Sequence, residues 1–333
     1  MVNNIKTLNN KNFANTVNKK IKLFSGNTSK QLAQKISDQI QVPIACMSVG
    51  KFSDGECSVS IGESVRGCDT FVIQSTSDPV NDSLMELLVI IDALKRASAA
   101  RITAVMPYFG YARQDRKARS RDPITAKLIA DLITTAGADR VLTMDLHAAQ
   151  LQGFFDIPVD HLYGIPVLRN YLKEQRFFDE HKDVIIVSPD VGSVSRARQF
   201  ATKLNLPIAI VDKRRPKPNE MEVMNIVGDV AGKTCLIVDD MIDTAGTIVK
   251  GAEALLNVGK AKNIYACCTH GVLSGQAINK IKDSCIKKMF ILDTIQLPSV
   301  KKIAKIVEIS VDKIFAIAIN SIFFDLSLSD VFE

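Results

Sequence analysis

The segment 234–248, TCLIVDDMIDTAGTI, carries the residues whose types and spacing point most clearly to chemistry. An apolar, strand-like run ends in two adjacent carboxylates, and a turn of small residues then opens a helical pattern. Ligands of open α/β sheets bind at the carboxyl ends of strands, and such a turn presents backbone N–H groups that suit a phosphate. The candidate residues are the carboxylates Asp239, Asp240 and Asp243 and the turn residues Thr244, Ala245, Gly246 and Thr247.

The two parts of this segment suit different groups of one ligand. The carboxylates cannot bind a phosphate, but they can accept hydrogen bonds from vicinal sugar hydroxyls, whereas the Thr hydroxyls add donors for the phosphate. A phosphate at one end and a diol at the other describe a ribose 5-phosphate. The competing interpretation is an Asp-rich helix cap without a ligand.

Two further strand-like runs also end in polar side chains. His147 ends the run 140–147 and Asp190 follows the run 184–189, so both are expected at strand C-termini, where ligands bind. A lone histidine is more often structural than a ligand, and nitrogen is an unusual ligand for Mg²⁺.

Two short basic clusters, 113–121 and 213–217, are candidates for phosphate contacts, although such runs are usually solvated surface. The prolines after Lys213 predict that the second cluster lies in a loop, which could close over phosphates. The loop 51–56, KFSDGE, places an aromatic ring beside carboxylates. That combination can stack on adenine and accept hydrogen bonds from its amino group.

The net charge of +6 is unevenly distributed, because the first 20 residues and the two basic clusters each contribute +4 and leave the remaining chain at −6. An acidic body argues against a nucleic-acid binder. The longest uncharged run, 264–279, is too polar for a membrane span. Seven cysteines without metal-site spacing predict reduced thiols in the cytoplasm, and the acid-free tail 1–20 is interpreted as a disordered extension rather than a transit peptide.

Apolar runs of strand length alternate with helical patterns, which predicts an α/β fold with mostly parallel sheets. Helices are expected at 82–98, capped by Asn81 or Asp82, at 123–136, opened by Pro123 and ended by Gly137, and at 246–257. Two similar three-layer α/β/α domains are expected, with the boundary near 153–166. The expected strands are 70–75, 101–108, 140–147, 184–189, 207–212, 234–240, 263–270 and 289–294.

The segment 234–248 resembles the ribose-phosphate binding loop of type I phosphoribosyltransferases and of ribose-phosphate pyrophosphokinases. Other segments resemble the pyrophosphokinases alone, and the similarity runs from about residue 22 to 325. These segments are 51–56, 75–82, 94–99, 107–121, 145–148, 152–162, 187–198, 212–216 and 268–275.

The resemblance implies a phosphoribosyltransferase-like fold and an activity. In the implied reaction, the diphosphoryl group of ATP moves to the anomeric hydroxyl of ribose 5-phosphate, giving 5-phosphoribosyl 1-diphosphate and AMP for nucleotide biosynthesis, with Mg²⁺ as cofactor. A phosphoribosyltransferase is the alternative enzyme, but it would leave segments 51–56 and 111–116 without a role. A catalytically silent regulatory homologue is the non-enzyme alternative, and it should have lost the catalytic cation.

The resemblance also implies a role for each matching residue. Lys213 is the catalytic cation, and Arg215 binds ribose 5-phosphate together with the segment 239–247. His147 and Asp190 hold Mg²⁺–ATP. The residues implied to bind ATP are Arg113 and Gln114, together with Phe52, Asp54, Gly55 and Glu56, which reach into the nucleotide site of a neighbouring subunit.

The family resemblance assigns residues 21–162 to an ATP-side domain and residues 163–308 to a domain that binds ribose 5-phosphate, with 309–325 packing back on the first. Family members form hexamers, and many respond to inorganic phosphate and ADP at a separate site. One departure from the family pattern follows Asp190, where many relatives carry Gly-Gly and this chain has Gly192-Ser193. Ser193 adds a Cβ where glycine would allow a positive φ.

Overall fold

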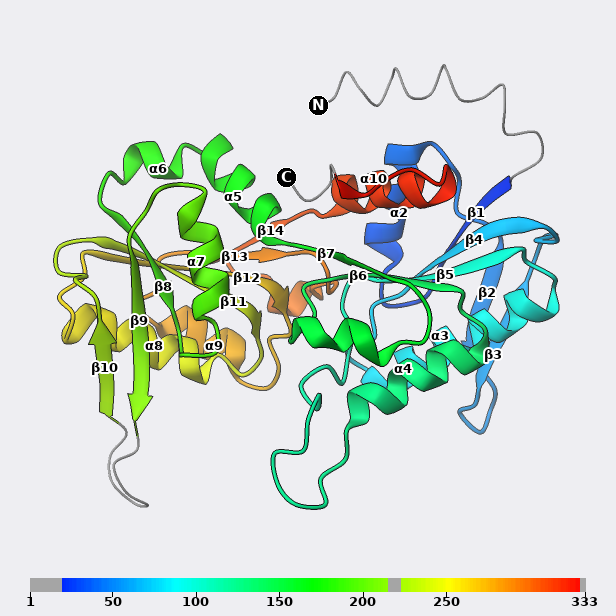
Figure 1. Ribbon diagram of the computed structural model, residues 1–333, viewed down its shortest axis with the longest axis horizontal. Helices are drawn as coiled ribbons and strands as arrows, with labels where there is room; N and C mark the ends of the chain where they lie inside the picture. Colours follow the sequence, from blue (N-terminus) through cyan, green and yellow to red (C-terminus); the bar gives the residue numbers. More distant parts are fainter. Residues whose placement is uncertain (1–19, 215–222, 330–333) are drawn as a thin grey trace.

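The structure is a computed structural model that describes residues 20–214 and 223–329, which form two α/β halves side by side (Figure 1). The sheet of the N-terminal half has, within the described residues, five parallel strands in the order β1-β4-β5-β6-β7. They are β1 (Lys20–Ser25), β4 (Cys68–Ile73), β5 (Arg101–Met106), β6 (Arg140–Met144) and β7 (Val159–Leu162).

Helices cover both faces of this sheet, because its strands are apolar at consecutive positions and bury both sides. In Figure 1, α2 (Lys30–Ile40) lies on one face, and α3 (Val80–Arg96) and α4 (Thr125–Ala136) lie on the other. A short 3₁₀ helix, η1 (Ala149–Phe154), follows β6. The antiparallel hairpin of β2 (Met47–Lys51) and β3 (Cys57–Ile61) stands at the outer side of this half.

The sheet of the C-terminal half is larger and is parallel except for one edge strand. Within the described residues its order is β10-β9-β8-β11-β12-β13-β14, and β10 runs antiparallel to β9. The strands are β8 (Val184–Ser188), β9 (Ile208–Arg214), β10 (Val223–Val227), β11 (Thr234–Ile242), β12 (Asn263–Gly271), β13 (Met289–Leu292) and β14 (Ile306–Ile309). The topology of the two sheets confirms the predicted α/β class.

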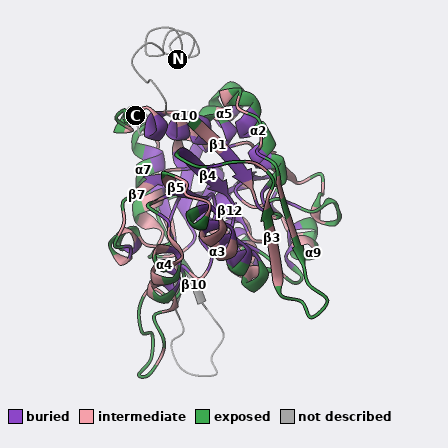
Figure 2. Cartoon of the chain, turned by 90° about the vertical axis from the view of Figure 1, so that its right-hand side faces the viewer, coloured by how far each residue is buried: buried purple, intermediate pink, exposed green. Residues whose placement is uncertain are grey.

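Helices also cover both faces of the larger sheet. One layer contains α5 (Ile165–Glu174) and α7 (Val194–Thr202), and the other contains α8 (Gly246–Asn257) and α9 (Ala277–Asp283). The short elements α6 (Phe177–Glu180) and η2 (Ser299–Lys301) lie in connections. Figure 2 shows the strands as the buried centre between half-exposed helices.

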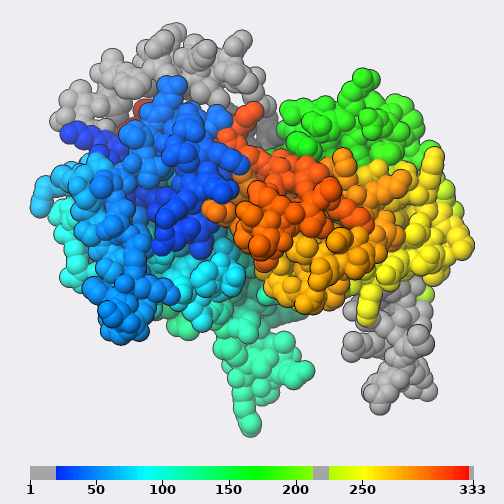
Figure 3. Space-filling model, turned by 180° about the vertical axis from the view of Figure 1, so that it is seen from behind, coloured from blue at the N-terminus to red at the C-terminus, as the bar shows by residue number. Residues whose placement is uncertain are grey.

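The last helix, α10 (Asp312–Phe323), leaves the C-terminal half and packs beside α2 of the N-terminal half. Gln39 donates to Asp312 at 2.8 Å, and the Arg101 guanidinium donates to the Ile322 carbonyl at 2.8 Å. From behind, the early and late parts of the chain lie against each other (Figure 3). One buried apolar layer therefore continues from the first sheet through α10 into the second.

All eight expected strands overlap observed ones, but several boundaries of helices and loops were wrong. Helix α3 begins at Val80, because its first turn closes by a hydrogen bond from Ser83 to the Pro79 carbonyl, so Asn81 and Asp82 lie inside that turn. Helix α4 begins only at Thr125, which leaves Pro123 outside the helix. Gly137 ends α4 with a φ of 121°, as predicted.

The basic segment that starts at Lys213 was expected in a loop, and this expectation was wrong for its first two residues. Lys213 and Arg214 belong to β9, because β10 pairs with the end of this strand and places Met224 opposite Lys213. Residues 215–222 lie outside the described residues, as does most of the tail 1–20.

Replacing Phe315 by alanine should destabilise the protein strongly, because this fully buried side chain of α10 packs in the layer shared by both halves. We expect a loss of about 3–5 kcal/mol in the free energy of unfolding. Urea unfolding at one fixed protein concentration measures the loss. Val300→Ala is the control, because Val300 is 88% exposed. Equal stability of the two variants would contradict the packing role of α10.

Candidate active site

A hydrogen bond joins the two halves where the carboxyl ends of their strands meet. His147 follows β6 of the N-terminal half, and its Nδ1 lies 2.7 Å from Oδ2 of Asp240 in β11 of the C-terminal half. The hydrogen bond to Asp240 raises the pKa of His147. Two residues expected at a ligand site from unrelated segments are therefore in direct contact.

Asp240 is buried, and both of its carboxylate oxygens have protein partners. Oδ2 contacts His147, and Oδ1 lies 3.2 Å from Nη1 of Arg196, which projects from α7. Burial opposes ionisation of this carboxyl, but the His147 hydrogen bond and the Arg196 charge outweigh it and lower the pKa of Asp240. The role of Asp240 as a ribose ligand stays a prediction, while its contacts position His147.

Asp239 has a different environment from its neighbour. Its Oδ1 accepts the backbone N–H of Asp240 at 2.9 Å and the hydroxyl of Ser193 at 3.0 Å. Burial, followed by the negative charge of Asp240, raises the pKa of Asp239 to about 7. The Asp240 carboxyl therefore ionises easily, whereas the pKa of the Asp239 carboxyl lies close to neutral pH.

Asp190 is linked to this pair through Ser193. The backbone N–H of Ser193 donates to Oδ1 of Asp190 at 2.8 Å, so hydrogen bonds run without a break from Asp190 through Ser193 and Asp239 to Asp240 and His147. Ser193 has a φ of −90°, which any L-residue adopts. Its Cβ therefore causes no backbone strain in the turn where many relatives carry glycine.

The turn after β11 opens helix α8 as the sequence predicted. Ala245 precedes the helix with a φ of 59°, and the twelve-residue helix begins at Gly246. Ala245 is buried and Gly246 is half-buried, whereas Thr244 and Thr247 on either side of them are exposed. The turn therefore places two exposed threonines beside the first backbone N–H groups of α8, an arrangement that suits a phosphate.

The turn also contacts the N-terminal half. Arg113, in the segment between β5 and α4, forms an ion pair of 2.7 Å with Asp243. Ser274, which follows β12, donates its hydroxyl to the other oxygen of Asp243. Burial opposes ionisation of Asp243, but the bonds from Ser274 and Arg113 prevail and lower its pKa. The neighbouring Gln114 accepts a hydrogen bond from Thr125 at the start of α4.

The predicted site residues thus fall into three groups. His147, Asp190 and Arg113 meet the segment 239–247 at the junction. Lys213 lies at the end of β9, and Arg215 lies outside the described residues. The third group stands apart at the tip of the β2–β3 hairpin, on the outer side of the N-terminal half (Figures 1 and 3), and consists of Phe52, Asp54, Gly55 and Glu56.

The sequence interpretation missed three side chains that hold the candidate ligands. Arg196 neutralises Asp240, Ser193 binds Asp239, and Ser274 binds Asp243. Arg196 could be recognised in the sequence as a charged residue. Nothing there indicated that its partner is Asp240, which lies 44 residues later. Ser193 stood out only as a departure from the family pattern, and nothing in the sequence singled out Ser274.

The junction offers few protein ligands for a magnesium ion. Among the residues that the structure describes, no three His, Cys, Asp or Glu side chains are grouped to hold a metal. Mg²⁺ commonly takes one or two protein groups and fills its other positions with substrate phosphates and water. The carboxylate of Asp190 and the free ring nitrogen of His147 fit such an ion, held mainly by its substrate.

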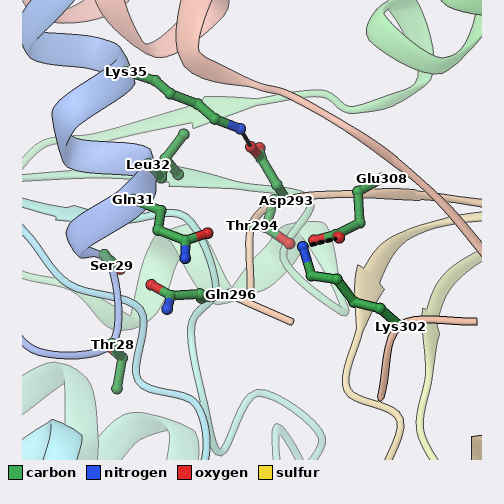
Figure 4. A pocket seen from close by; sticks show the side chains of 10 residues that line it. All are labelled: Thr28, Ser29, Gln31, Leu32, Lys35, Asp293, Thr294, Gln296, Lys302 and Glu308. Carbon is green, nitrogen blue, oxygen red and sulfur yellow. Dashed lines mark hydrogen bonds and ion pairs between the residues drawn. The ribbon is translucent and has the colours of Figure 1, made fainter. Parts of the chain in front are cut away.

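A separate hollow of about 100 Å³ lies between the start of α2 and the segment after β13 (Figure 4). Its two lysines are each neutralised: Lys35 lies 2.7 Å from Asp293, and Lys302 lies 2.8 Å from Glu308. A phosphate site needs uncompensated positive charge or free N–H donors. This hollow is therefore a poor match for the predicted ligand.

Comparisons with known proteins cover nearly the whole chain. Residues 21–137 match the N-terminal domain of ribose phosphate pyrophosphokinase, and residues 214–333 match the phosphoribosyl synthetase-associated domain. A ribose-phosphate pyrophosphokinase of Clostridium perfringens is 61% identical over 315 residues, 95% of this chain and 98% of that protein. One from Caldanaerobacter subterraneus subsp. tengcongensis is 62% identical over 312 residues, 94% and 98% of the two chains.

A solved structure agrees with these sequence matches. The crystal structure of phosphoribosylpyrophosphate synthetase from Mycobacterium smegmatis is similar with a TM-score of 0.87 and 41% identity, over 92% of this chain and 99% of that one. The parallel sheets, with paired carboxylates before a small-residue turn at a helix start, define a phosphoribosyltransferase-like enzyme. Within that class, the chain belongs to the ribose-phosphate pyrophosphokinase family. It is a transferase, and the resemblance found from the sequence is confirmed.

Asp239→Asn should change how stability depends on pH. The folded protein binds an extra proton at Asp239 between the ordinary pKa of 3.8 and about 7, so the free energy of unfolding falls as pH rises through this window. The variant lacks this proton and should lose less stability between pH 5 and pH 8, by roughly 2 kcal/mol. Urea unfolding at both pH values in metal-free buffer measures the difference.

The exposed Asp38→Asn is the matched control and should keep the wild-type profile. A D239N profile that runs parallel to wild type would contradict the raised pKa.

Proposed function

We propose that the junction between the two halves is where the diphosphoryl group of ATP is transferred to the anomeric hydroxyl of ribose 5-phosphate. The products are 5-phosphoribosyl 1-diphosphate and AMP, and the first of these supplies nucleotide biosynthesis. The observation that carries the proposal is the contact of His147 with Asp240 at 2.7 Å. It brings the candidate nucleotide segment of one half to the ribose-phosphate loop of the other.

Ribose 5-phosphate binds at the end of β11. The turn residues Thr244 to Thr247 and the start of α8 bind its phosphate through N–H groups and hydroxyls, and Arg215 adds a cation. Asp239 accepts hydrogen bonds from the vicinal ribose hydroxyls. The adjacent Asp240 positions His147 beside them. Asp243 and Arg113 form an ion pair in the structure, and this pair separates so that Arg113 can bind the ATP phosphates.

ATP binds beside the ribose through Arg113, Gln114, His147 and Asp190. Asp190 and His147 would hold Mg²⁺, which would supply positive charge to screen the transferred group. Lys213, at the end of β9, stabilises the negative charge that develops on this group in the transition state. The protein therefore acts by positioning and charge stabilisation rather than by covalent chemistry.

Incubation with ATP, ribose 5-phosphate and Mg²⁺ should give AMP in amounts equal to the phosphoribosyl diphosphate formed. Lys213→Ala should lower kcat about 100- to 1000-fold and change either KM far less, because the cation acts mainly in the transition state. Coupled measurement of AMP and separation of nucleotides by chromatography test both statements. The exposed Lys203→Ala is the control and should retain wild-type kinetics. Formation of ADP, or turnover by K213A equal to wild type, would reject the proposal.

We propose further that the active enzyme is a homo-oligomer, a hexamer by family resemblance, in which the hairpin tip completes the nucleotide site of a neighbour. The support is the position of Phe52, which is 58% exposed on a hairpin remote from the junction of its own chain. The adenine stacks on this ring, and Asp54 and Glu56 accept from its amino group near the Gly55 turn. By the same family resemblance, inorganic phosphate and ADP are expected as effectors at a separate site.

We place the enzyme in the cytoplasm, where the seven free cysteines stay reduced. In the part of the chain that the structure describes, no helix has the length and apolar character to cross a membrane. The binding of nucleic acid is not part of the proposal, because the body of the chain is acidic.

Mixing two inactive variants tests the shared site. Phe52→Ala and Asp239→Ala should each be nearly inactive alone, because each lacks one part of every site. Oligomers assembled from both chains contain some sites with neither change, so mixing and reassembly should restore part of the activity. The control mixes each variant with itself, and its activity should stay low. No recovery, despite mixed oligomers seen by native mass spectrometry, would contradict a site built from two subunits.

A further inference from the structure

Ser193 holds two candidate ligand groups at once. Its backbone N–H donates to Oδ1 of Asp190 at 2.8 Å, and its hydroxyl donates to Oδ1 of Asp239 at 3.0 Å. Ser193 stands at the N-cap position of α7, but its hydroxyl makes no capping hydrogen bond to that helix. The hydroxyl is therefore committed to Asp239 rather than to helix stability.

The position of these bonds constrains the Asp239 carboxylate. Both the Ser193 hydroxyl and the Asp240 N–H bind the same oxygen, Oδ1. Two donors on one oxygen restrict the rotation of the carboxylate, and Oδ2 is the oxygen that we assign to the ligand. Asp240 repels Asp239 at this adjacent position, so a carboxylate without the Ser193 donor would be free to turn away.

The two carboxylates of the pair are held by different means. Asp240 has a cation and an imidazole, Arg196 and His147, whereas Ser193 supplies a neutral hydroxyl to Asp239. A neutral donor orients a carboxylate without cancelling its charge. Asp239 thus accepts from sugar hydroxyls when its carboxyl is ionised.

We propose that Ser193 is a positioning residue that sets the affinity for ribose 5-phosphate by holding Asp239 in the orientation that receives the ribose diol. The proposal rests on the role proposed for Asp239. It also links the diol site to Asp190, because the backbone N–H of the same residue donates to that carboxylate.

Three substitutions at this position separate the hydroxyl from the backbone. Ser193→Ala should raise the KM and the calorimetric Kd for ribose 5-phosphate about five- to twentyfold, with kcat and the KM for ATP changed less than about twofold. Ser193→Thr keeps the hydroxyl and should retain near-wild-type affinity. Ser193→Gly restores the common pattern and should behave like alanine. Ser195→Ala, an exposed serine two residues later in α7, is the matched control and should behave like wild type.

A double-mutant cycle tests whether Ser193 acts through Asp239. If it does, Ser193→Ala should have no further effect on ribose 5-phosphate binding in an Asp239→Ala background. An equal effect in both backgrounds, or a wild-type Kd for S193A and S193G, would overturn the proposal. Loss of affinity in D239A without loss in S193A overturns only the role of Ser193. Unchanged affinity in D239A overturns the ribose role of Asp239 itself.

Unfolding temperatures exclude a general structural effect. All Ser193 variants should unfold within about 2 °C of wild type, because the hydroxyl caps no helix. If S193A fails to fold, S193T and S193G still decide the question by calorimetry, since they differ in the hydroxyl and both fit a φ of −90°.

Discussion

The rest of the site depends on one buried carboxylate. Asp240 is 5% exposed, and a charge at that depth is tolerated only with good partners. Its partners come from two places, Arg196 from α7 of the same half and His147 from the strand end of the other half. Burying Asp240 therefore requires the carboxyl ends of the strands of the two sheets to meet. This requirement brings the nucleotide segment and the ribose-phosphate loop together.

A second, purely polar contact reinforces the same junction without any ligand. His270, fully buried at the end of β12, contacts the carbonyls of Met144 and Asp145 at 3.2 and 3.1 Å, and Thr269 donates to the Asp145 carboxylate. Buried polar groups must be paired, so these bonds restrict how the halves can rotate against each other. The shared apolar layer stabilises the association of the two halves. The polar contacts fix the orientation of one half relative to the other.

The sequence could predict the elements that bury many consecutive apolar residues, but not those defined by pairing. The eight apolar runs were found because both their faces are buried, whereas β7 and β14 have polar residues among their four positions. Lys213 was expected in a loop because prolines follow it in the sequence. The pairing of β9 with β10, which extends the strand to this residue, could not be predicted from the sequence. At the site, motif residues such as Asp239 were predictable, but Ser193 and Arg196 were not, because their roles arise from partners about 45 residues away.

The position of α10 has a consequence for synthesis. This helix ends at Phe323, yet it covers α2, which begins at Lys30. A nascent chain emerges from the ribosome N-terminus first, so the face of α2 that packs against α10 stays uncovered until residue 323 has been made. The N-terminal half therefore completes its packing only after the C-terminal half has been synthesised, although the last strand of its own sheet ends at Leu162.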